Sequence, residues 1–148
     1  MKKLILLSII VFITGVVAKQ RAPMETKVLA VSQDVKPKSI KVKATYYNPV
    51  ESQCDSDPLT TASNDKINLK KLKAGKIRWI ACSRNLLKRW GGSFDYGDKV
   101  YITSKNKNVD GYWFVKDSMN KRYKDRIDFL CYDKIKGDIS TVRIRKVK

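Results

Sequence analysis

The sequence predicts a mainly β protein, a small closed structure of six short strands with one short helix. In six segments of the 148-residue chain apolar and polar residues alternate, which is the period of a strand with one buried face. Turns or loops separate these segments, and a single stretch has helical spacing. Because a small open sheet would expose two edges, closure of the strands into a barrel is favoured.

The first 18 residues have the pattern of a secretory signal peptide. Two lysines precede an apolar run over residues 4–18, which ends in small residues. This run is shorter than the roughly 20 apolar residues that span a bilayer, and an uncleaved anchor is the alternative. Residues 19–39 contain Pro23 and Pro37 without a sustained period, which predicts a flexible leader. We therefore expect export to the periplasm, the cell envelope or the extracellular space.

The predicted domain covers residues 40–148 and begins with a strand. Alternate positions of this strand are apolar and would face the core: Ile40, Val42, Ala44 and Tyr46. The polar segment 48–68 carries two prolines and several acids, and loops of this length are often functional. Further strands are expected at 77–82, 99–104, 111–117, 127–131 and 141–147.

Two basic stretches lie near the second strand. Ser83 is expected to cap a short helix that points Leu86, Leu87 and Trp90 inward, and the Gly91-Gly92 pair would end it. The lysine-rich stretch 70–73 is expected to be a solvated surface loop.

The charge of the chain limits its partners. The net charge is +18, and loss of residues 1–18 with their two lysines would leave +16. A basic surface attracts polyanions without regard to their sequence. For an exported protein these polyanions include anionic envelope polymers. The alternative is that the lysines only keep a small domain solvated and bind no polyanion. A nucleic-acid binder needs a face that combines aromatic and basic side chains, and the sequence identifies none, so no specific nucleic acid is expected.

The composition offers few ligands for a metal. The chain has no histidine, and Cys54, Cys82 and Cys131 lack Cys-x-x-Cys spacing, so we expect neither a metal nor a cofactor. Export permits a disulfide, but three cysteines form at most one internal bridge and their spacing does not identify it. Cys131 is also explained as a small apolar core residue, which is the commoner role of a lone cysteine in an apolar run.

Asp117 and Asp128 are the candidate functional residues. Asp117 ends an apolar run, and Asp128 stands between Ile127 and Phe129. A carboxylate in such a position must be solvated, hydrogen-bonded or protonated. The alternative is that both aspartates only form ion pairs with neighbouring basic residues, namely Lys116, Arg122 and Arg126.

Short motifs follow one another along residues 40–147. They are Ala44-Thr45-Tyr46-Tyr47, Thr61-Ala62-Ser63, Ile80-Ala81-Cys82-Ser83, Tyr96-Gly97-Asp98-Lys99-Val100-Tyr101-Ile102, and Val115-Lys116-Asp117 followed by Arg126-Ile127-Asp128-Phe129. Their order resembles the triple-aspartate (3D) domain family of six-stranded double-psi β-barrels. That family includes the barrel of the A-type membrane-bound lytic transglycosylase and is related to rare lipoprotein A and the expansins.

The resemblance implies a catalytic acid/base at Asp128 and a residue that shapes the site at Asp117. It implies a third aspartate in the acidic loop, where Asp55 fits best and Asp57 is the competitor. The family usually has Thr-Gly-Gly after the first of the paired aspartates. This chain has Ser118-Met119-Asn120 there, which narrows the accessible backbone conformations.

The predicted function is therefore cleavage of a cell-wall glycan such as peptidoglycan, as by a lytic transglycosylase, with an aspartate as general acid/base. Asp128 would be kept protonated by its flanking apolar residues and by the other carboxylates. Hydroxyl groups that suit sugar binding are those of Thr45, Tyr47, Thr61 and Ser63. Trp113 would stack on a sugar or pack in the core. The alternative function is an expansin-like module that binds peptidoglycan or another polysaccharide without cutting it.

Overall fold

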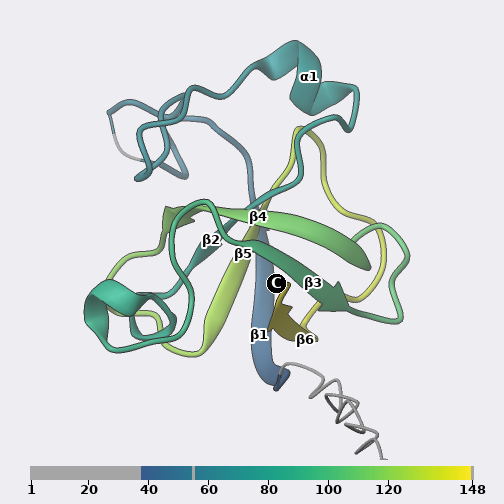
Figure 1. The fold of residues 1–148 in the computed structure, drawn as a ribbon. Coiled ribbons are helices and arrows are strands. Elements are labelled where there is room, and N and C mark those ends of the chain that lie inside the picture. The colour runs from purple at the N-terminus through teal and green to yellow at the C-terminus, as the bar shows by residue number, and fades with distance from the viewer. Residues whose placement is uncertain (1–37, 55, 148) are drawn as a thin grey trace, which may run out of the picture. The chain divides into compact units, whose positions relative to one another are not determined.

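The structure is a computed structural model, and it describes residues 38–54 and 56–147 (Figure 1). The predicted signal peptide (1–18) and residues 19–37 of the predicted leader lie outside the described residues, as does Asp55. Within the described part, no helix is long and apolar enough to cross a membrane.

Six strands of the described chain close into a barrel, as predicted. They are β1 (Ile40–Tyr47), β2 (Trp79–Cys82), β3 (Lys99–Thr103), β4 (Gly111–Ser118), β5 (Arg126–Leu130) and β6 (Thr141–Lys146). Their order around the barrel is β1-β5-β2-β4-β3-β6. The pairs β1–β5 and β2–β4 are parallel, and the other neighbours are antiparallel. Strands distant in the sequence therefore interleave, as in the predicted double-psi barrel.

The helical segments differ from the sequence-based expectation. Among the described residues one α-helix, α1 (Leu69–Lys73), lies in the lysine-rich stretch for which the sequence predicts a loop. It forms because the Asn68 side chain caps it, accepting a hydrogen bond from the Lys71 backbone N–H at 3.0 Å, and because Leu72 is buried. Leu72 belongs to the apolar cluster that holds the long loop on the barrel.

The helix expected after Ser83 is replaced by two 3-10 turns, η1 (Arg84–Leu86) and η2 (Lys88–Trp90). Leu87 between them is extended and bridges to Phe94, and this backbone pairing replaces helical hydrogen bonding. Gly91 ends η2 in the left-handed region at φ 88°, as predicted.

Two apolar clusters hold the fold. The barrel core consists of alternate strand side chains that point inward, among them Val42, Ala44, Val100, Ile102, Val115, Ile127, Phe129, Val142 and Ile144. The second, which we call the outer cluster, packs the segment between β1 and β2 on the outside of the barrel. Its buried members are Tyr47, Ile67, Leu72, Ile77, Ala81, Met119 and Leu130. Figure 1 shows that segment, with α1, on one side of the barrel.

Candidate functional site

The two predicted aspartates lie in one row of residues that crosses four neighbouring strands. Thr45 on β1 pairs with Asp128 on β5, Asp128 pairs with Ala81 on β2, and Ala81 pairs with Asp117 on β4. With strands about 4.8 Å apart, the Cα atoms of the two aspartates are about 10 Å apart. The methyl group of Ala81 is the only side chain between them in the row, which leaves the space above it open.

A register shift in the β2–β4 pair places Asp117 in this row. Ile80 pairs with Val115, whereas the next residue, Ala81, pairs with Asp117 and not with Lys116. Strict alternation would put Asp117 on the inner face with Val115. The extra residue on β4 instead turns the carboxylate outward, to the side of the barrel that carries the outer cluster.

Both carboxylates line a cavity of about 750 Å³ between the barrel and the loops around it. Its volume falls in the range of small-molecule sites. The lining residues are Tyr47, Gln53, Cys54, Asp57, Pro58, Thr60, Thr61, Ala62, Ala81, Arg84, Asp117, Ser118, Met119, Asn120, Arg122, Tyr123 and Asp128.

Asp128 has the properties of a proton donor. Burial raises the pKa of its carboxyl to about 6, with a smaller contribution from the negative charge of Asp117. The Thr45 hydroxyl and the Arg126 guanidinium favour the ionised form and limit the rise. The Oδ1 atom is buried and has no hydrogen-bond partner among the described residues.

The source of this burial differs from the sequence-based expectation. Ile127 and Phe129, which were expected to desolvate Asp128, point into the barrel core on the opposite face of β5. The carboxyl is instead buried on the outer side, where its row neighbour Ala81 and the nearby Tyr47 belong to the outer cluster. The sequence also predicted that a neighbouring aspartate raises the pKa of Asp128, and the negative charge of Asp117 does so.

Asp117 is held in place by hydrogen bonds on both oxygens. Its Oδ2 atom accepts from the Tyr47 hydroxyl at 3.2 Å, and its Oδ1 atom accepts from the backbone N–H groups of Ala62 at 3.0 Å and Ser118 at 2.7 Å. Burial and the Asp117 charge raise the pKa of Tyr47 far above its ordinary value, so this hydroxyl remains a donor. The geometry suits a positioning role for Asp117.

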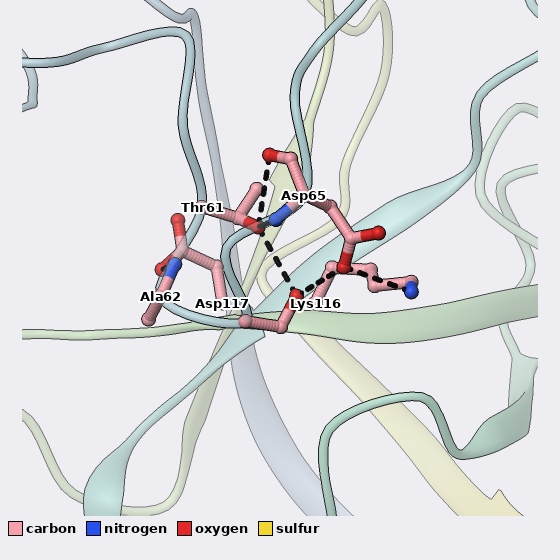
Figure 2. Close-up of polar contacts among 6 residues, drawn as sticks. Thr61, Ala62, Asp65, Lys116 and Asp117 are labelled. Atoms are coloured by element: carbon pink, nitrogen blue, oxygen red, sulfur yellow. Dashed lines mark hydrogen bonds and ion pairs between the residues drawn. The ribbon is translucent and has the colours of Figure 1, made fainter.

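A polar network fixes the wall of the cavity to β4 (Figure 2). The Lys116 ammonium forms an ion pair with Asp65 at 2.9 Å, and Asp65 accepts a hydrogen bond from the Ser63 hydroxyl at 2.5 Å. The Ser63 hydroxyl in turn lies 3.1 Å from that of Thr61. The Ser63 backbone N–H also donates to the Lys116 carbonyl at 3.1 Å. Together with the Ala62 contact to Asp117, these bonds fix the loop beside the carboxylates.

The other predicted site residues are distributed unevenly. Tyr47 and Thr61 line the cavity, and both are buried. Thr45 is exposed next to Asp128. Ser63 is outside the lining and serves the loop network. Trp113 is 4% exposed within the barrel core, where it packs on Phe129 and donates to the Val109 carbonyl at 2.8 Å.

Trp113 therefore has the packing role that was its alternative, and it does not line the cavity. Of the two candidates for the third aspartate, Asp55 lies outside the described residues. Asp57 lines the cavity and forms an exposed ion pair with Lys66 at 3.3 Å.

Several cavity residues were not identified as site residues from the sequence, among them two arginines and a tyrosine. Arg84 follows β2, and Arg122 and Tyr123 lie between β4 and β5, where the Tyr123 ring is within 4.9 Å of both the Arg122 and the Arg126 guanidinium. The signal that would have identified Arg122 and Tyr123 is their place in the short connection between the two candidate aspartates.

The departure from the family motif adds bulk to the site. Ser118, Met119 and Asn120 line the cavity, and none of them has a positive φ. The expected free-energy cost of a left-handed backbone conformation at Met119 is therefore absent. The extended strand β4 continues through Ser118, the residue before it. Met119 instead fills space as a buried member of the outer cluster.

The described residues also bear on the alternative functions of the acidic groups. Asp128 takes part in none of the ion pairs formed between described residues. Within the same residues, no group of three or more histidine, cysteine, aspartate or glutamate side chains could hold a metal ion. Cys82 is a thiol in the barrel core, and Cys131 is a half-buried thiol just after β5.

No family model and no curated protein matches the chain. Among solved structures the chain is similar to the "Streptomyces papain inhibitor (SPI)", with a TM-score of 0.49 and 14% identity, over 78% of this chain and 100% of that one. A similarity of this size says nothing about activity. The six-stranded barrel is established by the structure, and membership of the triple-aspartate family stays a prediction from the motifs.

Proposed function

We propose that the protein is an exported enzyme that cleaves a β-1,4-linked cell-wall glycan such as peptidoglycan, with Asp128 as general acid and then general base. The observation that carries this proposal is the Asp128 carboxyl, whose pKa is about 6 in a cavity open to substrate. A carboxyl with this pKa carries its proton in about half of the molecules at pH 6 and in about one molecule in ten at pH 7. Its Oδ1 atom is buried without a hydrogen-bond partner among the described residues, which disfavours the ionised form and supports a carboxyl that holds its proton.

The hydrogen bonds that Asp117 accepts support a mechanism with Asp128 as the single acid/base residue. Asp117 accepts hydrogen bonds from the Tyr47 hydroxyl and from the backbone N–H groups of Ala62 and Ser118, and it would position the substrate or the loop. In the reaction of a lytic transglycosylase, the sugar's own 6-hydroxyl attacks the anomeric carbon. Asp128 would protonate the leaving oxygen and then accept the proton of that hydroxyl, so that the product carries a 1,6-anhydro ring.

The second candidate function is a module that binds the glycan without cutting it. The observation that favours it is the side-chain bulk of Met119 and Asn120 where the family has two glycines, since glycine allows close approach of a sugar to the backbone. In this case the same cavity holds the polymer, and Asp128 serves only as a hydrogen-bonding group.

Incubation of the purified protein with peptidoglycan separates the two functions. The enzyme hypothesis predicts soluble fragments whose masses correspond to 1,6-anhydro ends, and kcat/KM should fall as pH rises through about 6 because Asp128 loses its proton. Asp128→Asn should lower kcat by roughly 10²- to 10⁴-fold. Asp133→Asn, which removes an exposed carboxylate just after β5, is the matched control and should leave turnover unchanged.

Other outcomes of the peptidoglycan incubation would support a different function or mechanism. Retention on peptidoglycan without soluble fragments would establish the binding module. Fragments with hydrolysed reducing ends would replace the anhydro mechanism by hydrolysis. Unchanged release of anhydro products by Asp128→Asn would remove Asp128 from the mechanism.

A further inference from the structure

The outer surface of β3, β4 and β6 combines aromatic and basic side chains. Its residues, which we call the basic-aromatic face, are Lys99, Tyr101, Tyr112, Phe114, Arg143 and Arg145. They point outward because the residues that alternate with them, such as Val100, Trp113 and Ile144, belong to the barrel core. These positions come from three separate segments of the sequence, which explains why no such face was apparent in it.

The strand register places the rings and the cations side by side. Tyr101 on β3 pairs with Tyr112 on one side and with Arg145 on the other, and Lys99 pairs with Phe114. The Tyr101 and Tyr112 rings meet edge to face with centroids 5.0 Å apart. The Arg145 guanidinium lies 4.9 Å from the Tyr101 ring centre.

Two of the rings remain open to solvent. Tyr112 is 49% exposed and Phe114 is 39% exposed, although both lie within a strand of the closed barrel. The Lys99 ammonium lies 4.3 Å from the Tyr112 ring centre, so a cation stands next to an exposed ring. Large exposed apolar side chains that adjoin one another mark an interaction surface.

The positive charge of the basic-aromatic face favours an anionic partner. The six positions include three basic residues and no acid, and Lys41 on β1 extends the basic row because it pairs with Arg143. Polyol phosphates and lipid headgroups offer charge without flat rings, and neutral glycans offer ring faces without charge. Single-stranded nucleic acid combines regularly spaced phosphates with flat bases, and proteins bind it by a basic surface with stacking aromatic rings.

We propose that the basic-aromatic face binds single-stranded nucleic acid without sequence preference. Bases stack on Tyr112 and Phe114, and the phosphates lie against Lys99, Arg143 and Arg145. The face uses none of the residues that line the cavity, so this activity is independent of glycan cleavage.

Fluorescence anisotropy of the full-length protein tests the proposal with two labelled probes of equal length and charge. One is an oligothymidylate, and the other is the same sugar-phosphate chain without bases. The oligothymidylate should bind more tightly by about 5- to 150-fold for each stacked base. Tyr112→Leu and Phe114→Leu, which keep an apolar side chain without the flat ring, should each remove such a factor for oligothymidylate and leave the abasic probe unchanged.

The salt dependence tests the basic residues. The slope of log affinity against log salt should be less steep by about 0.7 for each phosphate contact removed, hence by about 1.4 in the Arg143→Gln/Arg145→Gln variant. Lys70→Gln/Lys71→Gln on α1 removes the same charge away from the face and should leave the slope unchanged. Thermal unfolding of each variant verifies that it is folded.

Three results would overturn the proposal. Equal affinity for the two probes would mean that the bases make no contact. Equally tight binding of polyglycerol phosphate would assign the face to anionic envelope polymers. Loss of affinity in the α1 variant equal to that in the arginine variant would mean that only the overall charge attracts the probe.

Discussion

Replacement of Asp128 by asparagine should stabilise the fold at neutral pH. The ordinary pKa of this carboxyl is 3.8, and its pKa in the folded protein is about 6, a difference that corresponds to about 3 kcal/mol. Because burial raises the pKa, the folded protein retains a proton that the unfolded chain has released. Ionisation of Asp128 therefore destabilises the fold, and asparagine removes that cost because it does not ionise.

The pH dependence of this effect is the specific expectation. Below pH 3.8 both states carry the proton and the ionisation cost is absent. It grows as pH rises from 3.8 to 6 and is complete above 6. The difference in unfolding free energy between Asp128→Asn and the wild type should therefore increase by up to about 3 kcal/mol between pH 4 and pH 8.

Urea unfolding of the two proteins at both pH values measures this increase. Any fixed cost of burying the amide is the same at both pH values and cancels in the comparison. Asp133→Asn reports the effect of removing one exposed carboxylate. A difference between Asp128→Asn and the wild type that is equal at pH 4 and pH 8 would refute the reasoning, because Asp128 would then not be destabilising when ionised.

Three further variants test the open space at the site, one of its hydrogen bonds and the packing of a glycine against the backbone. Ala81→Leu should fill the gap between the site carboxylates and abolish glycan binding in a sacculus pull-down, and unchanged binding would contradict the proposed site. The larger side chain should also lower the unfolding free energy by about 1–3 kcal/mol. Tyr47→Phe removes the donor to Asp117 and should cost about 1–3 kcal/mol in urea unfolding, whereas a neutral result would show that the bond contributes nothing. Gly92→Ala would drive its Cβ into the Leu86 backbone and should lower the melting temperature, whereas a melting temperature equal to that of the wild type would exclude this close approach.

The alternation of apolar residues was sufficient to predict the strands. Val42 and Ala44 on β1 and Val142 and Ile144 on β6 point into the barrel core as their spacing requires. Apolar spacing failed to predict the helical segments, since Leu86 lies in a 3-10 turn and Leu87 is extended and pairs with Phe94. Apolar spacing reports which residues are buried and not which backbone hydrogen bonds form.

The sequence by itself determined that this is a barrel of short strands with a basic surface, and that Asp117 and Asp128 are its unusual carboxylates. Only the tertiary structure decided which way they point. A one-residue register shift turns Asp117 outward, and the outer cluster, not the flanking core residues, buries Asp128. Both depend on pairing between strands that are far apart in the chain, because the environment of a side chain is set by its neighbours across the sheet and not by those beside it in the sequence.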